Sequence, residues 1–450
     1  MAAFAAPPQA GAYWIRRTRV PRSLVRDAPA GASADADTDD CLLLDIRIEG
    51  GALTAMVAAA AAAAPNDGLP VLDLAGRQLW PALADLHTHI DKSQVRGRMG
   101  RLGASFESAR EAIVKDRQMY WSREDIRARM DFSVRCAYVN GTAALRSHID
   151  SYEGQAELSW AVFAELRAAW QGRVDLQATT SVPIDVYASD YGRRLADLAA
   201  TTAGGLLGGV LRRSSDHNYG YIDNIAELLD AQFTLAKERG LAIDLHVDET
   251  LKAGDSHLDE VARAVMRHGL EGRVVVGHLC SLSARSDDQI AASLALCAEA
   301  GLGVVSLPVS NLYMHDRTPG RTPRLRGVTL AQEMLARDIP FAIASDNVRD
   351  AFIPIGDYDL FELLRQSVAI YHLDQCLDAA PAMVSAAPAR MMGMAPAGTL
   401  AVGAPANLIA FNARSLNELL SRAQADRMVL NAGRLVTDAL PDFAQLDPPA

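Results

Sequence analysis

The sequence predicts an α/β fold: a (β/α)8 TIM barrel with a small β-domain formed by the N- and C-terminal segments. From residue 83 to about residue 385, apolar segments of strand length alternate with longer amphipathic segments, which is the pattern of repeated βα units. Residues 1–82 and 386–450 contain short alternating segments broken by turns. The length of 450 residues also fits a barrel of roughly 250–300 residues with an accessory domain.

The two terminal segments are expected to form one sheet. Trp14–Val20 and Cys41–Glu49 alternate apolar and polar positions and predict strands, separated by the loop Asp27–Asp40, which is rich in Pro, Gly, Ala and Asp. After about residue 385, Gly398–Phe411 and Arg427–Thr437 again read as strand and turn. The simplest account is that residues 1–82 and 386–450 pair into one β-domain beside the barrel.

The barrel segment, residues 83–385, contains eight candidate strands separated by amphipathic stretches. The expected strands are Ala82–Ile90, Thr142–Asp150, Val174–Val182, Gly205–Leu211, Ala242–Glu249, Val274–Leu279, Gly303–Leu307 and Phe341–Asn347. The expected helices are Arg123–Val139, Leu158–Trp170, Asp223–Arg239, Leu258–His268, Asp287–Ala300 and Leu330–Asp338. Several of these stretches end in a glycine, where a left-handed cap is favourable.

Composition excludes several classes of function. The net charge of −11 argues against binding to nucleic acid, whose phosphates require basic patches. No run of about 18 apolar residues predicts a membrane span, and the first residues lack the pattern of a signal peptide. Five scattered cysteines do not form a disulfide framework. We therefore expect a cytoplasmic protein that acts on a small molecule, with homo-oligomer formation left open.

The stretch Leu83–Lys92 holds two histidines, His87 and His89, separated by one residue. In a β-strand, side chains at i and i+2 point to the same face. Two imidazoles on one strand face can grip a single metal ion, and the apolar residues around them indicate a buried strand.

Further polar residues lie on the other predicted strands, mostly at their ends. Because the chemistry of a (β/α)8 barrel sits at the carboxyl ends of its strands, these side chains are expected to converge on one rim. They are His148 and Asp150, Gln177, His246 and Glu249, His278, and Asp346 with Asn347. Three imidazoles and one carboxylate suit zinc, iron(II) or manganese. Glu249, three residues past His246, is well placed to move protons.

The succession His87-Thr88-His89, His246, Glu249, His278 and Asp346 resembles the amidohydrolase superfamily, specifically its cytosine deaminase-like branch. The resemblance runs from about residue 81 to residue 375. It implies one divalent metal ion per chain, held by His87, His89, His246 and Asp346. It also implies that Glu249 shuttles protons, that His278 polarises the reacting carbon or orients the hydroxide, and that Asp346 takes part in catalysis. Gln177 matches the glutamine with which cytosine deaminases read the base edge.

One position departs from that branch. Cytosine deaminases usually follow the metal-binding aspartate with a second aspartate that touches substrate, and here Asn347 stands there. The amide carries no charge and can donate as well as accept, which argues against cytosine itself and leaves a related cyclic amidine or amide open. Asn347 is expected to contact that substrate. Lys92 is expected to be a member of a structural ion pair. The roles of His148 and Asp150 are left open, and His217, His257, His268, His315 and His372 are expected on the surface or in loops.

The sequence thus predicts hydrolytic deamination of a nitrogen heterocycle by metal-bound hydroxide, with release of ammonia. Cytosine-like pyrimidines, purines, pterins and triazines remain open as substrates. One alternative is hydrolysis of a substituted amine or cyclic amide by the same site, as in triazine aminohydrolases. Another is a non-catalytic barrel scaffold, which would be expected to lack a ligand or the glutamate.

Overall fold

The computed structural model describes residues 4–35, 40–59, 67–103, 105–216, 218–394 and 397–447. His217 and part of the predicted loop Asp27–Asp40 lie outside the described residues. The chain divides into two compact units. One unit comprises Met1–Ala84, Ala137–Ala144 and Leu360–Leu440, and the other comprises Asp85–Cys136, Leu145–Asp359 and Pro441–Ala450.

The first unit contains a nine-stranded sheet to which both ends of the chain contribute. Its strands run in the order β17-β16-β15-β6-β1-β3-β2, with β4 paired to β3 and β5 to β1. Their bounds are β1 Ala12–Pro21, β2 Ala34–Asp35, β3 Cys41–Glu49, β4 Ala52–Ala58, β5 Val71–Asp73, β6 Gln78–Pro81, β15 Leu408–Phe411, β16 Met428–Asn431 and β17 Arg434–Leu435. The antiparallel pairing of β15 with β6 joins the C-terminal segment to the N-terminal one. The predicted composite sheet is confirmed.

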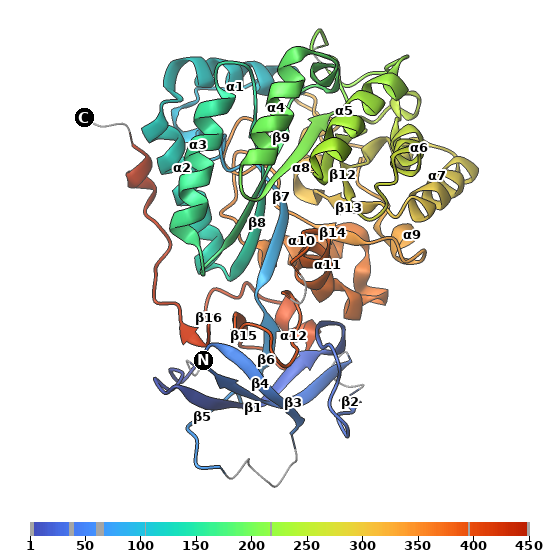
Figure 1. Ribbon diagram of the computed structural model, residues 1–450. Coiled ribbons are helices and arrows are strands. Elements are labelled where there is room, and N and C mark those ends of the chain that lie inside the picture. The colour runs from blue at the N-terminus through green and yellow to red at the C-terminus, as the bar shows by residue number, and fades with distance from the viewer. Residues whose placement is uncertain are drawn as a thin grey trace. The chain divides into compact units, whose positions relative to one another are not determined.

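The second sheet is the predicted barrel, with eight strands in the order β14-β13-β12-β11-β10-β9-β8-β7 (Figure 1). Their bounds are β7 Leu83–Thr88, β8 Thr142–Asp150, β9 Asp175–Ser181, β10 Gly205–Val210, β11 Ile243–Val247, β12 Val274–His278, β13 Gly303–Ser306 and β14 Phe341–Ile343. The first and last strands meet through a single parallel bridge, Thr88 with Asp346, so the barrel is nearly closed. Each strand lies within the residues predicted for it, and β14 is the one that falls furthest short of its predicted end.

The helices that follow the strands occupy the outside of this barrel, as Figure 1 shows for α2 to α7. They are α1 Phe106–Tyr120, α2 Arg123–Val139, α3 Ala156–Trp170, α4 Asp190–Thr201, α5 Ile225–Arg239, α6 Leu258–His268, α7 Asp287–Glu299, α8 Pro308–Met314 and α9 Ala331–Leu335. Three more follow: α10 Leu360–Tyr371, α11 Ala386–Met391 and α12 Leu416–Leu420. The described helices include none that is both long and apolar enough to span a bilayer.

Among the helices that were not predicted from the sequence, α1 and α4 are the longest beside the barrel strands, and both have a defined cap. The start of α1 is fixed by a capping box, in which the hydroxyls of Ser105 and Ser108 each accept from the backbone N–H of the other residue. The cap of α4 is Ser189, whose hydroxyl accepts from the backbone N–H of Gly192. The predicted glycine ends are confirmed at Gly240 and Gly269, which have φ values of 66° and 64°.

Candidate active site

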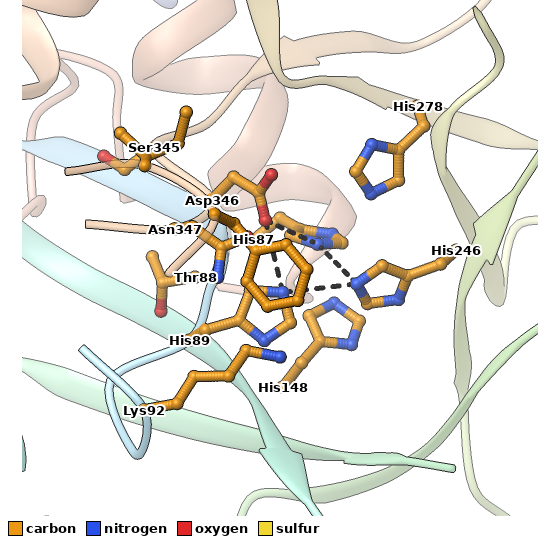
Figure 2. Close-up of polar contacts among 12 residues, drawn as sticks. His87, Thr88, His89, Lys92, His148, His246, His278, Ser345, Asp346 and Asn347 are labelled. Atoms are coloured by element: carbon orange, nitrogen blue, oxygen red, sulfur yellow. Dashed lines mark hydrogen bonds and ion pairs between the residues drawn. The ribbon is translucent and has the colours of Figure 1, made fainter. Parts of the chain in front are cut away.

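Four buried side chains from three parts of the barrel converge on one point (Figure 2). His87 and His89 lie at the end of β7, His246 near the end of β11, and Asp346 three residues past β14. The Nε2 atoms of His87 and His89 are each 3.2 Å from Nε2 of His246. Asp346 Oδ1 is 3.2 Å from Nε2 of His89 and 3.7 Å from Nε2 of His87.

These separations match a shell of metal ligands. Zinc–nitrogen bonds of 2.0–2.1 Å in tetrahedral geometry place neighbouring ligand atoms about 3.3 Å apart. Burial, and then the neighbouring imidazoles, hold the pKa values of His87 and His246 well below the usual value, which keeps their lone pairs available. Both carboxylate oxygens of Asp346 are buried without a hydrogen-bond partner. The four residues therefore fit a divalent ion by donor type and by spacing.

The backbone at the end of β14 is bent to deliver Asp346. The predicted strand Phe341–Asn347 ends at Ile343, because Asp346 adopts a left-handed φ of 59°. Two bonds hold this turn: Ser345 N donates to Asp85 Oδ1 at 3.1 Å, and Asp346 N donates to the carbonyl of His87 at 2.9 Å. A left-handed aspartate carries strain that the surrounding bonds must offset, a situation common at functional sites.

His278 and Glu249 lie beside the four converging residues. Asn311 Nδ2 is 2.9 Å from Nδ1 of His278, so this nitrogen accepts and the buried Nε2 carries the proton. Burial lowers the pKa of His278 to about 4, so its ring is neutral. Glu249 Oε1 is 3.6 Å from the same Nδ1, and Glu249 Oε2 accepts from the hydroxyl of Tyr219 at 2.8 Å. Burial, together with the charge of Asp346, raises the pKa of Glu249 to about 8.

His148, whose role the sequence left open, belongs to a layer of side chains in contact with the converging imidazoles. Its ring centroid lies 3.9 Å from that of His87 and 4.5 Å from that of His246. Its Nε2 is 3.5 Å from Asp244 Oδ1, and Asp244 Oδ2 accepts from Arg146 at 2.8 Å. His87, His148 and Asp244 also satisfy the spacing of a metal-ligand group. His148 therefore supports the ring of His87 from within the barrel.

The structure does not bring Gln177 to the pocket that holds the other residues. Its side-chain oxygen accepts from Nε and Nη2 of Arg146, at 3.0 and 2.9 Å. The residue of β9 that lines the pocket is Ser181, at the carboxyl end of the strand. Gln177 shares a strand face with Ser181 but lies four residues earlier, which is about 13 Å along a strand.

Asp150, at the end of β8, is shared by two cations. Lys92 Nζ is 3.2 Å from its Oδ1, and Arg117 on α1 bonds to its Oδ2. Burial alone would raise the pKa of Asp150, but Lys92 and Arg117 outweigh it and lower that pKa to about 2. Lys92 thus occupies the ion pair expected from the sequence, and the same side chain lines the pocket.

Asn347 lines the pocket next to Asp346. Its amide nitrogen donates to Asp350 Oδ2 at 2.5 Å, and Asp350 Oδ1 accepts from the backbone N–H groups of Phe352 and Ile353. Burial raises the pKa of Asp350 to about 6. Because only one of its two amide N–H groups is engaged by Asp350, Asn347 can offer a ligand its oxygen as an acceptor and its second N–H as a donor.

The pocket above these residues encloses about 640 Å³, counted to its open mouth. Three aromatic rings lie together on its wall: Phe106 is 5.7 Å from Tyr219 and 5.4 Å from Phe352, between ring centroids. Sequence reasoning missed several of the lining residues, namely Arg110, Arg117, Ser181, Arg212 and Tyr219. An aromatic wall with a few convergent polar groups is typical of a small-molecule site.

Comparison with known proteins agrees with this geometry. A pterin deaminase of Rhizobium rhizogenes is 40% identical over 446 residues, covering 99% of this chain and 98% of the relative. Among solved structures, a 5-methylcytosine deaminase from Klebsiella pneumoniae liganded with phosphonocytosine gives a TM-score of 0.79 at 20% identity, covering 95% and 98% of the two chains. An adenosine deaminase from Xanthomonas campestris with bound zinc gives a TM-score of 0.66 at 18% identity, covering 96% and 95%.

The model of one protein family, described as the amidohydrolase family, matches residues 138–437. This range is more than half of the chain, and it begins on α2 and includes His246, Glu249, His278 and Asp346. The full-length relative extends the similarity over the His87–His89 pair as well. The chain belongs to the amidohydrolase family and is a hydrolase that acts on carbon–nitrogen bonds.

Proposed function

We propose that this protein is a metal-dependent deaminase of a bicyclic amino-substituted heterocycle of the pterin class. The observation that carries the proposal is the convergence of His87, His89, His246 and Asp346 within 3.2–3.7 Å, with Glu249 and His278 beside them. The full-length similarity to a pterin deaminase supports the choice of substrate class.

In the proposed reaction, water adds to the ring carbon that carries the amino group, the carbon–nitrogen bond breaks, and ammonia leaves while a ring carbonyl forms. A divalent ion bound by the four ligands would lower the pKa of a coordinated water and make it nucleophilic near neutral pH. Glu249, once ionised, takes a proton from the attacking water and delivers it to the departing amino nitrogen. His278 donates from Nε2 to the oxygen that is added, because its Nδ1 already accepts from Asn311.

Asn347 is proposed to contact the substrate through its oxygen. With its nitrogen donating to Asp350, the side chain can accept a hydrogen bond from a ring N–H or an amino group. It lacks the charge of the aspartate that the cytosine deaminase-like pattern places here. A hydrogen bond to a charged group contributes about 1.5–3 kcal/mol, against about 0.5–1.5 kcal/mol for a neutral pair, so we expect the protein to be a poor cytosine deaminase.

One divalent ion per chain is proposed, with zinc, iron(II) and manganese all compatible with the ligand set. The cytoplasm is proposed as the compartment, because no disulfide joins the five cysteines, all of which lie among the described residues, and four of them are buried. Elemental analysis of protein purified without added metal would identify the ion. Fractionation of the source cells would test the compartment.

The proposal is tested by measuring ammonia release from pterin, guanine, cytosine and an amino-triazine. The protein is reconstituted separately with zinc, iron(II) and manganese. Glu249→Gln should keep the ion and the fold but lose activity by a factor of at least 10²–10⁴. The matched control is Glu299→Gln, at the exposed end of α7, which should behave as the wild type. Absence of ammonia release with every ring and every ion, or near-normal turnover by Glu249→Gln, would refute the proposed function.

A further inference from the structure

Arg212 is a buried cation at the pocket with no acidic partner. It follows β10, its exposed fraction is 4%, and it lines the pocket. Its Nη1 donates to two backbone carbonyls, those of Arg213 at 2.8 Å and Asp216 at 2.6 Å. Among the described residues no carboxylate lies within ion-pair distance of this guanidinium, and Nε and Nη2 make no hydrogen bond.

A buried charge of this kind is costly unless something neutralises it. Removing an ion from water carries an effective penalty of several kcal/mol, and two carbonyl bonds supply dipoles but no opposite charge. The edge formed by Nε and Nη2 is the one with which arginine grips a planar oxyanion through two parallel hydrogen bonds. The free edge of Arg212 is therefore suited to an anion that arrives from the pocket.

The side chains that line the pocket include more cations than carboxylates, and each of those carboxylates is already engaged elsewhere. Helix α1 presents one face to it, with Phe106, Arg110, Ile113, Val114 and Arg117 at spacings of three and four residues. Of the three acids that line the pocket, Asp150 is shared by Lys92 and Arg117. The other two, Glu249 and Asp346, belong to the catalytic cluster and its ion. No acid that lines the pocket is left over for Arg212.

We propose that Arg212 binds an anionic oxygen group, a carboxylate or a phosphate, carried by the substrate. On this inference the natural substrate is an anionic derivative of the heterocycle, not the bare ring, and Arg212 determines that specificity. The inference rests on the proposed deaminase function and adds to it the chemical class of the substituent. The neutral ring still reaches the cluster at His246 and Glu249, but it leaves the charge of Arg212 uncompensated.

The experiment compares four forms of the pterin ring. One is unsubstituted, and the others carry a carboxylate, the neutral carboxamide of the same shape, or a phosphomethyl group. Ammonia release gives kcat and KM for the wild type, for Arg212→Met and for Arg213→Met. Arg212→Met keeps most of the apolar stem and removes the charge. Arg213→Met is the matched control, because the neighbouring side chain pairs with Asp223 away from the pocket lining and its backbone carbonyl is retained.

In the wild type, KM for one anionic form should be on the order of 10- to 100-fold lower than for the carboxamide, the loss typical of a charge-assisted hydrogen bond. Arg212→Met should abolish that preference while leaving kcat and KM for the two neutral rings close to the wild-type values. Arg213→Met should change neither. The anion whose KM responds to Arg212→Met identifies the group as carboxylate or phosphate.

Two results would overturn the inference, and they can be told apart. Equal loss of activity toward neutral and anionic rings in Arg212→Met would mean that Arg212 only holds its loop through the carbonyls of Arg213 and Asp216, while the deaminase function stands. Equal KM values for all four rings in the wild type would likewise show that Arg212 does not bind the substituent, while the deaminase function stands. Failure of every ring to release ammonia would instead overturn the proposed function and the inference with it.

Discussion

Removing the hydroxyl of Tyr219 should move the acid limb of the pH–activity profile to higher pH. This hydroxyl donates to Glu249 Oε2 at 2.8 Å, and the ring that carries it packs against Phe106. The bond stabilises the ionised carboxylate and so opposes burial and the charge of Asp346, which raise the pKa of Glu249 to about 8. Tyr219→Phe removes the donor but keeps the ring.

The size of the shift follows from the strength of the bond. A hydrogen bond to a charged group contributes about 1.5–3 kcal/mol, and one pKa unit corresponds to about 1.4 kcal/mol. Without the donor, the pKa of Glu249 should therefore rise by about one to two units. Because Glu249 must be ionised to accept a proton, kcat/KM on the acid side should fall by roughly 10- to 100-fold, and it should recover at high pH. A bound cation lowers the starting pKa but does not change the direction of this shift.

The assay is kcat/KM for the best substrate from pH 5 to pH 10, at constant ionic strength, in the metal-loaded wild type and variant. The matched control is Tyr221→Phe, two residues away in the same loop with a side chain that is 67% exposed. Its profile should overlay that of the wild type. An acid limb of Tyr219→Phe that stays in place, or a uniform fall in activity at all pH values, would refute the reasoning.

Three further predictions concern the metal ligands and their neighbours. His246→Ala should lose the bound ion together with activity, as measured by elemental analysis, and full metal occupancy would contradict the ligand assignment. His148→Ala leaves a void against the ring of His87, so zinc titration of the metal-free variant should show an affinity roughly 10- to 100-fold weaker than the wild type. Asn347→Asp places a second carboxylate beside Asp350, whose pKa is already raised to about 6 by burial. The folded state then holds a proton more tightly than the unfolded chain, so the melting temperature of this variant should fall more steeply than that of the wild type as the pH rises through 6.

The parts of the site that lie on regular strands could be predicted from the sequence. The alternation of side chains along β7 places His87 and His89 on one face, and the carboxyl ends of parallel strands meet at one rim. The positions of His246 and His278 follow from the same rule. The alternation of strand-length and helical segments from residue 83 to about 385 likewise predicted the barrel. The short alternating segments at both ends of the chain predicted the composite sheet.

The parts that could not be predicted lie where side chains meet through loops. Tyr219 and Arg212 follow β10 in a segment without periodicity, and nothing local indicates that they line the pocket. Gln177 has the right residue type on the right face, but it lies too early on its strand. His257 lies in the loop before α6, as expected, but it is buried there. Its backbone N–H donates to Asp248 and its ring accepts from the backbone N–H of Ile222.

The boundary between the first and last barrel strands, β7 and β14, affects the local stability of the metal-free protein. Beyond their single bridge, β7 and β14 are joined by contacts between residues far apart in the chain, such as Ser345 with Asp85, which are 260 positions apart. His87 and His89 lie on one side of this boundary and Asp346 on the other. An ion bound by all three would therefore link the first strand to the last and stabilise the closed barrel. The metal-free protein should open first along this line, with faster amide exchange in β14 than in the continuous ladder from β9 to β13.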